Sequence, residues 1–305
     1  MIRYIVRRVF WIIPVLFVVS IMTFALMHSV PGGPWAREKA LPAATVARLN
    51  EKFGLDKPIY EQYVTWVANL AQGNLGPSYK FVDRTVNDIV AEGIWTTVQL
   101  GVMAFLLSVV VGIPLGIFGA LGHNRSPDYI STGISVIGIA MPSFVFAILL
   151  IVFFGVTLKL LPTGGWKGPD TWILPTIALA GFPIAVIARY TRASMLEVTR
   201  KDYIRTAHSK GVGDRDVVSR HMIRNALIPV ITILGPILAF LVTGSFIIET
   251  IFGIPGVGRY YITSIAQKDY GVLMAMTILY AFVIAFLNII VDVLYAYIDP
   301  RIRYS

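Results

Sequence analysis

The chain has 305 residues, of which 56% are hydrophobic and only 14% are charged, whereas a soluble domain usually carries about 25% charged residues. The net charge of +9 does not indicate a nucleic-acid partner, because the basic residues lie between long apolar runs rather than on one soluble domain. The chain has no cysteine, which excludes disulfides and thiolate metal sites.

Uncharged stretches long enough to cross a membrane recur along the chain, because a helix needs about 20 apolar residues to span roughly 30 Å of hydrocarbon. The first follows three arginines and is interpreted as an uncleaved anchor, since its apolar run is longer than that of a signal peptide and no small-residue cleavage site follows. The six predicted spans are Val9–His28, Thr97–Leu121, Ile130–Thr157, Trp172–Ala188, Ala226–Ile248 and Gly271–Val291.

Lysine and arginine in the short connecting segments predict the orientation. With the N-terminus inside, the inner segments, which include Arg301 and Arg303 at the C-terminus, hold fifteen basic residues, whereas the short outer loops hold four. We therefore expect a multi-pass protein of the cell membrane with both termini in the cytoplasm.

The segment 29–96 is the one hydrophilic stretch expected on the outer side. Interrupted helical patterns predict short amphipathic helices over Ala43–Phe53, Pro58–Gln72 and Asp83–Ala91. The segment is either a packed cap without chemistry or a gate or docking surface for an external partner. The predicted organisation is thus a first helix in 1–28, an outer helical segment 29–96 and a core membrane domain 97–305.

The motifs of catalysis and ion coupling are missing from the sequence. No glycine is followed by lysine, so there is no phosphate-binding loop, and any ATP is expected to be hydrolysed by another chain. There is no H-E-x-x-H motif and no nucleophile elbow, and the four histidines are scattered, so neither a catalytic nor a metal site is expected. No predicted span has an ionisable residue near its centre, which argues against a self-sufficient secondary carrier or channel.

The inner loop 189–225 is the most informative segment. We predict a helix over Ser194–Lys210 that continues the fourth span, a break at Gly211-Val212-Gly213, and a second helix capped by Asp214. The less polar face of that second helix comprises Val217, Val218, His221 and Met222. The loop either binds anionic lipid headgroups or docks a cytoplasmic partner.

The sequence of this loop resembles a known family. Asp202-Tyr-Ile-Arg-Thr-Ala-His-Ser-Lys-Gly211 and Arg220-His-Met-Ile-Arg-Asn-Ala-Leu-Ile-Pro229 are similar to the EAA coupling loop of binding-protein-dependent ABC importer permeases. Arg205 and Thr206 stand where the general pattern has Glu and the first Ala, and the proline lies several residues further from Gly211. Both departures are typical of the peptide/nickel branch of that family.

Other segments extend the resemblance over nearly the whole chain. Gly54–Tyr63, Gly73–Gly76 and Met141–Phe144 resemble oligopeptide and dipeptide permeases, as do Arg3–Arg8 at the N-terminus and Glu249–Arg259 after the fifth span. The resemblance implies an all-α type I ABC importer permease with an extracytoplasmic helical insertion after its first helix.

The resemblance also implies partners and roles. The expected partners in the bilayer are a second homologous permease, two ABC ATPases that bind ATP and Mg, and an extracytoplasmic binding protein; this chain binds no cofactor and no nucleic acid. The expected cargo is di- or oligopeptides, with nickel chelates, oligosaccharides or other solutes as alternatives. The residues expected to couple to the ATPases are Tyr203, Arg205, Thr206, Ala207, His208, Lys210, Gly211 and Asp214, and the outer loop after the fifth helix contributes Glu249, Phe252, Pro255, Gly256 and Gly258.

A secondary carrier that works alone, a membrane scaffold and an intramembrane enzyme are the alternatives from other functional classes. Transport by the isolated chain in liposomes would indicate the first of them. The absence of catalytic motifs argues against the enzyme.

Overall fold

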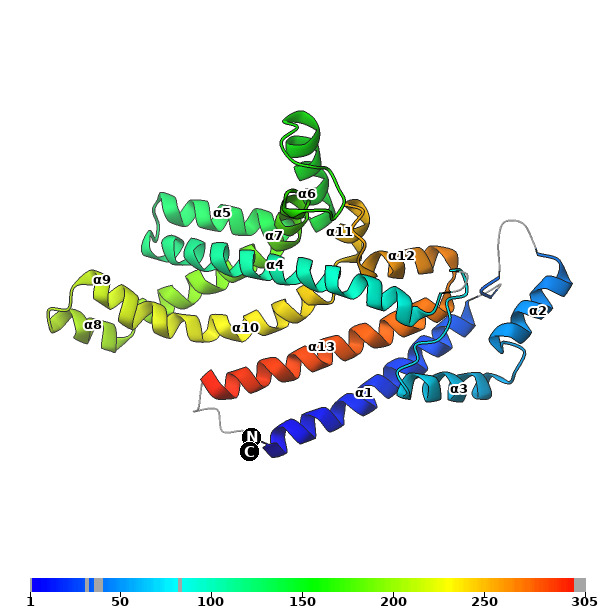
Figure 1. Cartoon of the computed structure of the whole chain (residues 1–305). Coiled ribbons are helices and arrows are strands. Elements are labelled where there is room, and N and C mark those ends of the chain that lie inside the picture. Colours follow the sequence, from blue (N-terminus) through cyan, green and yellow to red (C-terminus); the bar gives the residue numbers. More distant parts are fainter. Residues whose placement is uncertain (1, 31–32, 36–40, 82–83, 299–305) are drawn as a thin grey trace. The chain divides into compact units, whose positions relative to one another are not determined.

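The computed structural model describes residues 2–30, 33–35, 41–81 and 84–298, with the side chains of 6–30, 33–35, 41–81 and 84–290. The predicted all-helical class is confirmed: the described chain contains helices and no strand (Figure 1). It divides into two compact units, one formed by parts of 1–97 and 255–305 and the other by Val98–Ile254. The predicted termini Arg301 and Arg303 lie outside the described residues.

In the first unit, two long apolar helices, α1 (Ile2–Ser29) and α13 (Tyr270–Ile298), lie side by side (Figure 1). Much of α1 remains exposed in the isolated chain; Phe10 and Ile13, for example, are both 64% exposed. A large exposed apolar surface is expected of a helix whose solvent is lipid. The unit also contains α2 (Ala43–Phe53), α3 (Ile59–Ala71), the first turns of α4 (Val86–Leu121) and α12 (Val257–Gln267).

The outer segment differs from its prediction in one helix. The helices predicted at Ala43–Phe53 and Pro58–Gln72 are confirmed as α2 and α3. The predicted short helix over Asp83–Ala91 is wrong, because its described residues enter α4, which continues without a break into the second predicted span. Val86 and Ile89 at this start of α4 are fully buried against Val257, Val272 and Met276, so the entry into the span is part of a packed core.

A buried carboxylate joins the outer segment to α13. Asp269 is fully buried and accepts hydrogen bonds from Ser78 Oγ at 2.5 Å and from the backbone N–H groups of Tyr79 at 3.0 Å and Lys80 at 3.2 Å. It also accepts one from Val272 N–H at 3.3 Å and so caps α13. Burial and the Asp269 charge raise the pKa of Tyr79 to about 12, so that phenol stays neutral.

The second unit is built around α7 (Pro169–Thr199), which packs against α5 (Ser126–Ala140), α6 (Ser143–Leu150), α10 (Arg224–Val242) and α11 (Phe246–Ile251). Small residues on α4 permit close approach. A Cβ added at Gly116 would lie 2.5 Å from the carbonyl oxygen of Ala188, so a larger residue would force α4 and α7 apart. Ala104 and Ser108 on the same helix are also fully buried.

The third predicted span is not one straight helix. The chain breaks at Met141-Pro142 between α5 and α6, and α6 continues into a π-helix, η1 (Ile151–Thr157); the two helical pieces meet at 107°. Pro142 lacks an N–H and restricts the residue before it to an extended conformation, which Met141 adopts with ψ 120°. The described chain has five helices long and apolar enough to cross a membrane, or six if this bent pair is one span, in agreement with the predicted number.

A charged cluster fixes α5 to α7. The Asp128 side chain is almost completely buried and receives two hydrogen bonds from Arg192, from Nε at 2.5 Å and from a guanidinium NH2 at 2.9 Å. The backbone N–H of Asn124 donates to it at 2.9 Å, and His123 Nδ1 lies 3.1 Å away. A bidentate, hydrogen-bonded pair of this kind stabilises only while both partners remain, because the survivor would be a buried unpaired charge.

We therefore predict that Arg192→Gln lowers the free energy of unfolding by about 2 kcal/mol or more, measured by denaturant unfolding of the purified chain. Arg200→Gln, which changes an exposed arginine at the end of the same helix, should cost less than about 0.5 kcal/mol. The double variant Asp128→Asn/Arg192→Gln should lose less stability than the sum of the two single variants. Strict additivity would contradict a direct interaction.

Candidate functional site

The inner loop forms a helix, a turn and a second helical segment, but its boundaries differ from the prediction. The predicted continuous helix over Ser194–Lys210 is wrong: α7 ends at Thr199, and after a turn at Arg200-Lys201 a separate helix, α8 (Asp202–Ser209), begins. Lys201 adopts an extended conformation before α8. Neither glycine nor proline marks this break, so residue type did not reveal it.

The end of α8 is fixed by its backbone. Gly211 has φ +77°, a left-handed conformation that glycine adopts without steric cost. Its N–H donates to the carbonyl of His208 at 2.9 Å, and the N–H of Val212 donates to Ala207 at 3.2 Å. These two bonds form a Schellman motif, which stops the helix and turns the chain. The predicted break at Gly211-Val212-Gly213 is confirmed.

The expected capping by Asp214 is wrong. The residue in the capping position of the next helix, α9 (Asp214–Asp216), is the extended Gly213, and no side chain caps that helix. Asp214 is instead the first helical residue, where its charge still favours the positive end of the helix dipole. Its exposed carboxylate lies 3.6 Å from Nδ1 of His208, on the other side of the turn.

One face of α8 is buried in the second unit. Ile204 and Ala207, three residues apart, pack in a cluster with Met195 and Val198 of α7. The cluster also contains Ala120 of α4, Val217 and Met222 of the π-helix η2 (Val217–Ile223), and Ala226 of α10. The predicted less polar face is confirmed, since Val217 and Met222 are buried and Val218 and His221 are half-buried. The cluster connects α8 to both helices that flank the loop.

Ala207 and Gly211, both expected to couple to the ATPases, do not lie on one face of α8. Ala207 is only 7% exposed and faces the cluster, whereas Gly211 lies beyond the helix end and is exposed. Residues four apart lie on the same face only while both are helical, and Gly211 is outside the helix.

The opposite face of α8 is polar and exposed. Thr206 and Ser209 are exposed, and their hydroxyls donate to backbone carbonyls one turn earlier in the helix, at 3.0 Å each. Arg205 and Lys210 are exposed, and no acidic side chain of the described chain pairs with either. In Figure 1, α8 and α9 form the tip of their unit beyond α10. The exposed residues, hereafter the α8 surface, are Tyr203, Arg205, Thr206, His208, Ser209 and Lys210.

The residues predicted in the loop after the fifth span are mostly buried. In the second unit, Glu249 and Phe252 are 0% and 1% exposed, and the carbonyl of Phe252 accepts a hydrogen bond from Gly165 N–H at 2.7 Å. In the first unit, Gly256 and Gly258 are buried at the start of α12, and only Pro255 is exposed. Within their own units, these residues therefore have a packing role, apart from the exposed Pro255.

Sequence reasoning missed two buried carboxylates, those of Asp128 and Asp269. Asp128 follows Ser-Pro at a helix start, and Asp269 directly precedes a long apolar run; both positions are ones where an aspartate stabilises a helix N-terminus. Their partners Arg192 and Ser78 lie 64 and 191 residues away in the sequence, and no spacing rule connects them.

Comparison with known proteins identifies the family to which the sequence of this chain is similar. Residues 112–304 match the family described as binding-protein-dependent transport system inner membrane component, and residues 1–101 match the N-terminal model of such membrane components. The oligopeptide transport system permease protein OppB of Salmonella typhimurium is 43% identical over 306 residues, with 100% of both chains covered. The dipeptide transport system permease protein DppB of Bacillus subtilis is 41% identical over 303 residues, covering 99% of this chain and 98% of DppB.

Solved structures share the fold at lower identity. The MetNI methionine ABC transporter in an inward-facing conformation aligns with a TM-score of 0.58 at 16% identity, covering 69% of this chain and 96% of that one. An amino acid ABC transporter aligns with a TM-score of 0.55 at 15% identity, covering 76% and 98%. The family models cover most of the chain, and relatives above 40% identity cover its full length. The chain therefore belongs to the binding-protein-dependent transport system inner membrane components, the permease subunits of ABC importers.

Proposed function

We propose that this permease moves di- or oligopeptides across the membrane, with energy delivered through the α8 surface by separate ATPase subunits. The observation that carries the coupling role is that α8 has two different faces. One face is buried against α7, η2 and α10, and the other exposes Arg205 and Lys210, which pair with no acidic side chain among the described residues. The peptide cargo is supported by full-length similarity to permeases named for oligopeptides and dipeptides.

The arrangement suits mechanical coupling. A force applied to the exposed face of α8 passes through Ile204 and Ala207 to Met195 on α7 and to Met222 beside α10. Because packed interiors resist compression, a displacement of α8 moves these helices rather than dissipating in the loop. A lipid-binding loop would need the basic side chains but not the buried contact between α8 and the helices beneath it. The observation therefore favours a protein partner over lipid headgroups.

The remaining partners follow from the proposed function. A second permease completes the pathway, two ATPases bind ATP and Mg, and an extracytoplasmic binding protein delivers the peptide. In this scheme the α8 surface lies in the cytoplasm and α2 and α3 lie on the outer side, where they form a docking surface for the binding protein or the second permease.

The orientation has a direct test. The chain has no native cysteine, so Glu61→Cys on α3 and Ser209→Cys on α8, both at exposed positions, supply single labelling sites. We predict that a membrane-impermeant maleimide labels position 61 in intact cells and position 209 only in inverted vesicles. Labelling of both positions from one side would contradict the scheme.

Coupling is tested by reversing charge on the α8 surface. We predict that Arg205→Glu/Lys210→Glu weakens ATPase binding about tenfold, because each lost or reversed exposed pair contributes up to about 1 kcal/mol. Peptide-stimulated ATP hydrolysis by the reconstituted transporter should fall in parallel. Substitution of Ala207 is a poorer test, because this buried residue supports the fold.

Arg125→Glu is the matched control, since it reverses an exposed positive charge in the loop between α4 and α5. It should leave ATPase affinity within about twofold of the unmodified transporter. Normal ATPase binding and transport by the α8 double variant would refute coupling through this surface.

A further inference from the structure

The first unit contains an apolar groove between α1, α3 and α13 that has no part in the coupling described above. It has a volume of about 600 Å³. Ser20 is the one polar side chain among the described residues that line it. The Ser20 hydroxyl donates to the carbonyl of Phe17 at 2.7 Å and lies 2.8 Å from the hydroxyl of Tyr63. Water needs several polar partners to occupy a cavity, so this lining suits an apolar occupant.

The groove lies at the depth of the middle of the membrane spans. Its α1 residues, within 13–20, lie around the centre of the span Val6–Ser29. Its α13 residues, within 278–282, lie around the centre of the span Tyr270–Ile290. Hydrocarbon about 30 Å thick surrounds the middle of such helices. The solvent at the groove is therefore the acyl chains of lipids.

Helix α3 runs from the end of α1 toward this depth, although it belongs to the segment predicted to lie outside. Near its start, Gln62 Oε1 lies 3.1 Å from Nε2 of His28 in the last turn of α1. Tyr63 reaches Ser20, which is eight residues or about 12 Å further along α1. The last turn of α3, within 67–71, lines the groove. Figure 1 shows α3 beside the second half of α1.

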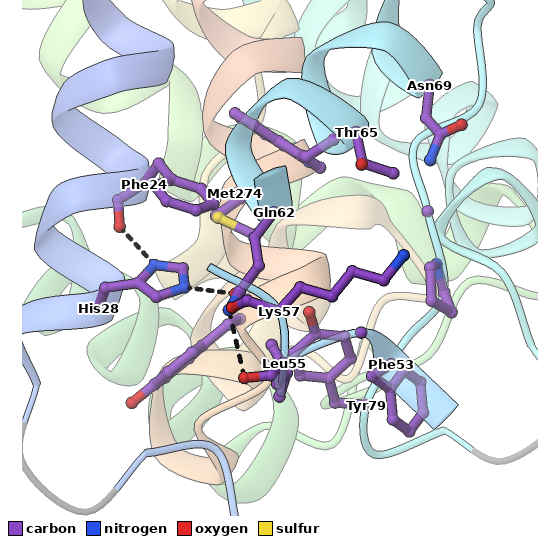
Figure 2. A pocket seen from close by; sticks show the side chains of 15 residues that line it. Phe24, His28, Phe53, Leu55, Lys57, Gln62, Thr65, Asn69, Tyr79 and Met274 are labelled. Carbon is purple, nitrogen blue, oxygen red and sulfur yellow. Dashed lines mark hydrogen bonds between the residues drawn. The ribbon is translucent and has the colours of Figure 1, made fainter. Parts of the chain in front are cut away.

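The side chains of α3 are arranged as in a helix surrounded by lipid. The polar residues Gln62, Thr65 and Asn69 share one face and line a pocket inside the first unit (Figure 2). Away from that pocket, Tyr60 and Val64 are 68% and 63% exposed. Polar side chains that face the protein interior and apolar ones that face outward are typical of membrane segments.

Charge distinguishes α3 from α2. No charged residue occurs in the sequence between Glu61 and Lys80, whereas the shorter α2 carries Arg48, Glu51 and Lys52. Charged side chains are rare within the hydrocarbon of a bilayer because they are costly there. The composition of α3 therefore suits the bilayer, and that of α2 suits water.

The turn after α3 satisfies its backbone N–H groups without water. Those of residues 72–74 donate to carbonyls of α3 at 3.0 Å each. Those of Leu75 and Gly76 donate to the side-chain oxygens of Asn87 at 2.8 Å and Asn74 at 2.9 Å. Irregular backbone is tolerated at membrane depth only where protein groups replace water as partners. The turn meets this condition for each of its five N–H groups.

The size and surroundings of the groove favour a lipid chain over a helix of another permease. An α-helix about 10 Å wide would fill 600 Å³ with roughly five residues, far fewer than a membrane span needs. The groove is also continuous with the apolar surface of α1, where Ile13 and Phe17 are 64% and 53% exposed. An acyl chain is thin and flexible enough to enter from that surface.

We infer that this groove holds one acyl chain of a phospholipid, and that α3 lies over the chain within the leaflet where α1 ends. The site goes beyond the proposed function, because it depends on the membrane insertion of α1 and α13 and not on the cargo or on coupling through α8. In the proposed orientation this leaflet is the outer one.

The depth of α3 is tested with spin labels on the assembled transporter in phosphatidylcholine nanodiscs. The chain has no native cysteine, so Ala71→Cys in the groove wall and Ala47→Cys on the exposed side of α2 each supply one labelling site, with cysteine-free partner subunits. We expect oxygen, which concentrates in hydrocarbon, to relax the label at position 71, and a water-soluble nickel chelate to relax the label at position 47. Equal access of the chelate to both labels would overturn the inference, and so would exclusion of both reagents from position 71, because protein would then cover the groove.

The occupant is identified with phosphatidylcholine that carries a photoreactive diazirine near the end of one acyl chain. We expect this probe to form adducts on Leu70 and Phe17, which line the groove. The same lipid with the diazirine in its headgroup should give at least about tenfold fewer adducts there, because the groove lies near the bilayer centre. Equal labelling by the two probes, or no adduct on either residue, would overturn the inference.

A matched pair of variants assigns the adducts to the groove. Ala71→Phe places a ring in the groove and should lower the adduct yield on Phe17 at least about threefold, because the ring and the chain cannot share the space. Ala68→Phe makes the same change at an exposed position of α3 outside the groove and should leave the yield within about twofold. Equal losses in the two variants, or no loss in Ala71→Phe, would contradict a chain held in this groove.

Discussion

The contact of Ile204 and Ala207 with the cluster beneath α8 is the interaction on which the functional account depends. Without it, the inner loop would be a solvated basic segment tethered at two ends. With it, α8 becomes a rigid extension of α7 and α10. The Schellman turn at Gly211 then fixes where the helix ends.

In the proposed mechanism, α8 transmits motion to helices that are themselves closely packed. Gly116 permits backbone contact between α4 and α7, and the Arg192–Asp128 pair fixes α5 to the same helix one turn before the cluster that holds α8. The second unit therefore links the α8 surface to most of its helices through α7. Within the first unit, the carboxylate of Asp269 likewise joins two segments, because it caps α13 and accepts a hydrogen bond from Ser78 in the outer loop.

Much of this architecture was predictable, because a bilayer imposes a length and composition on every span. The membrane helices and the helix–turn–helix loop follow from apolar runs, glycine positions and the resemblance around Gly211. The break in the third span was not predicted. Hydropathy measures how apolar a segment is but not whether its helix is straight, and Pro142 lies within a continuous apolar run. The end of α7 at Thr199 has no local signal. The burial of Ala207 could not be predicted, because it depends on packing against residues of α7 and η2. The pairings of Asp128 and Asp269 could not be predicted either, because they join distant parts of the chain.

The central claim is that the exposed face of α8 contacts an ATPase. The most direct measurement is photo-crosslinking with p-benzoylphenylalanine in place of Tyr203, which is 43% exposed on α8, and in place of Tyr190, which is 51% exposed on α7. Both changes replace one exposed aromatic side chain with another. In the assembled transporter, position 203 should cross-link to an ATPase subunit and position 190 should not. An ATPase adduct at position 190 with none at position 203 would contradict the account.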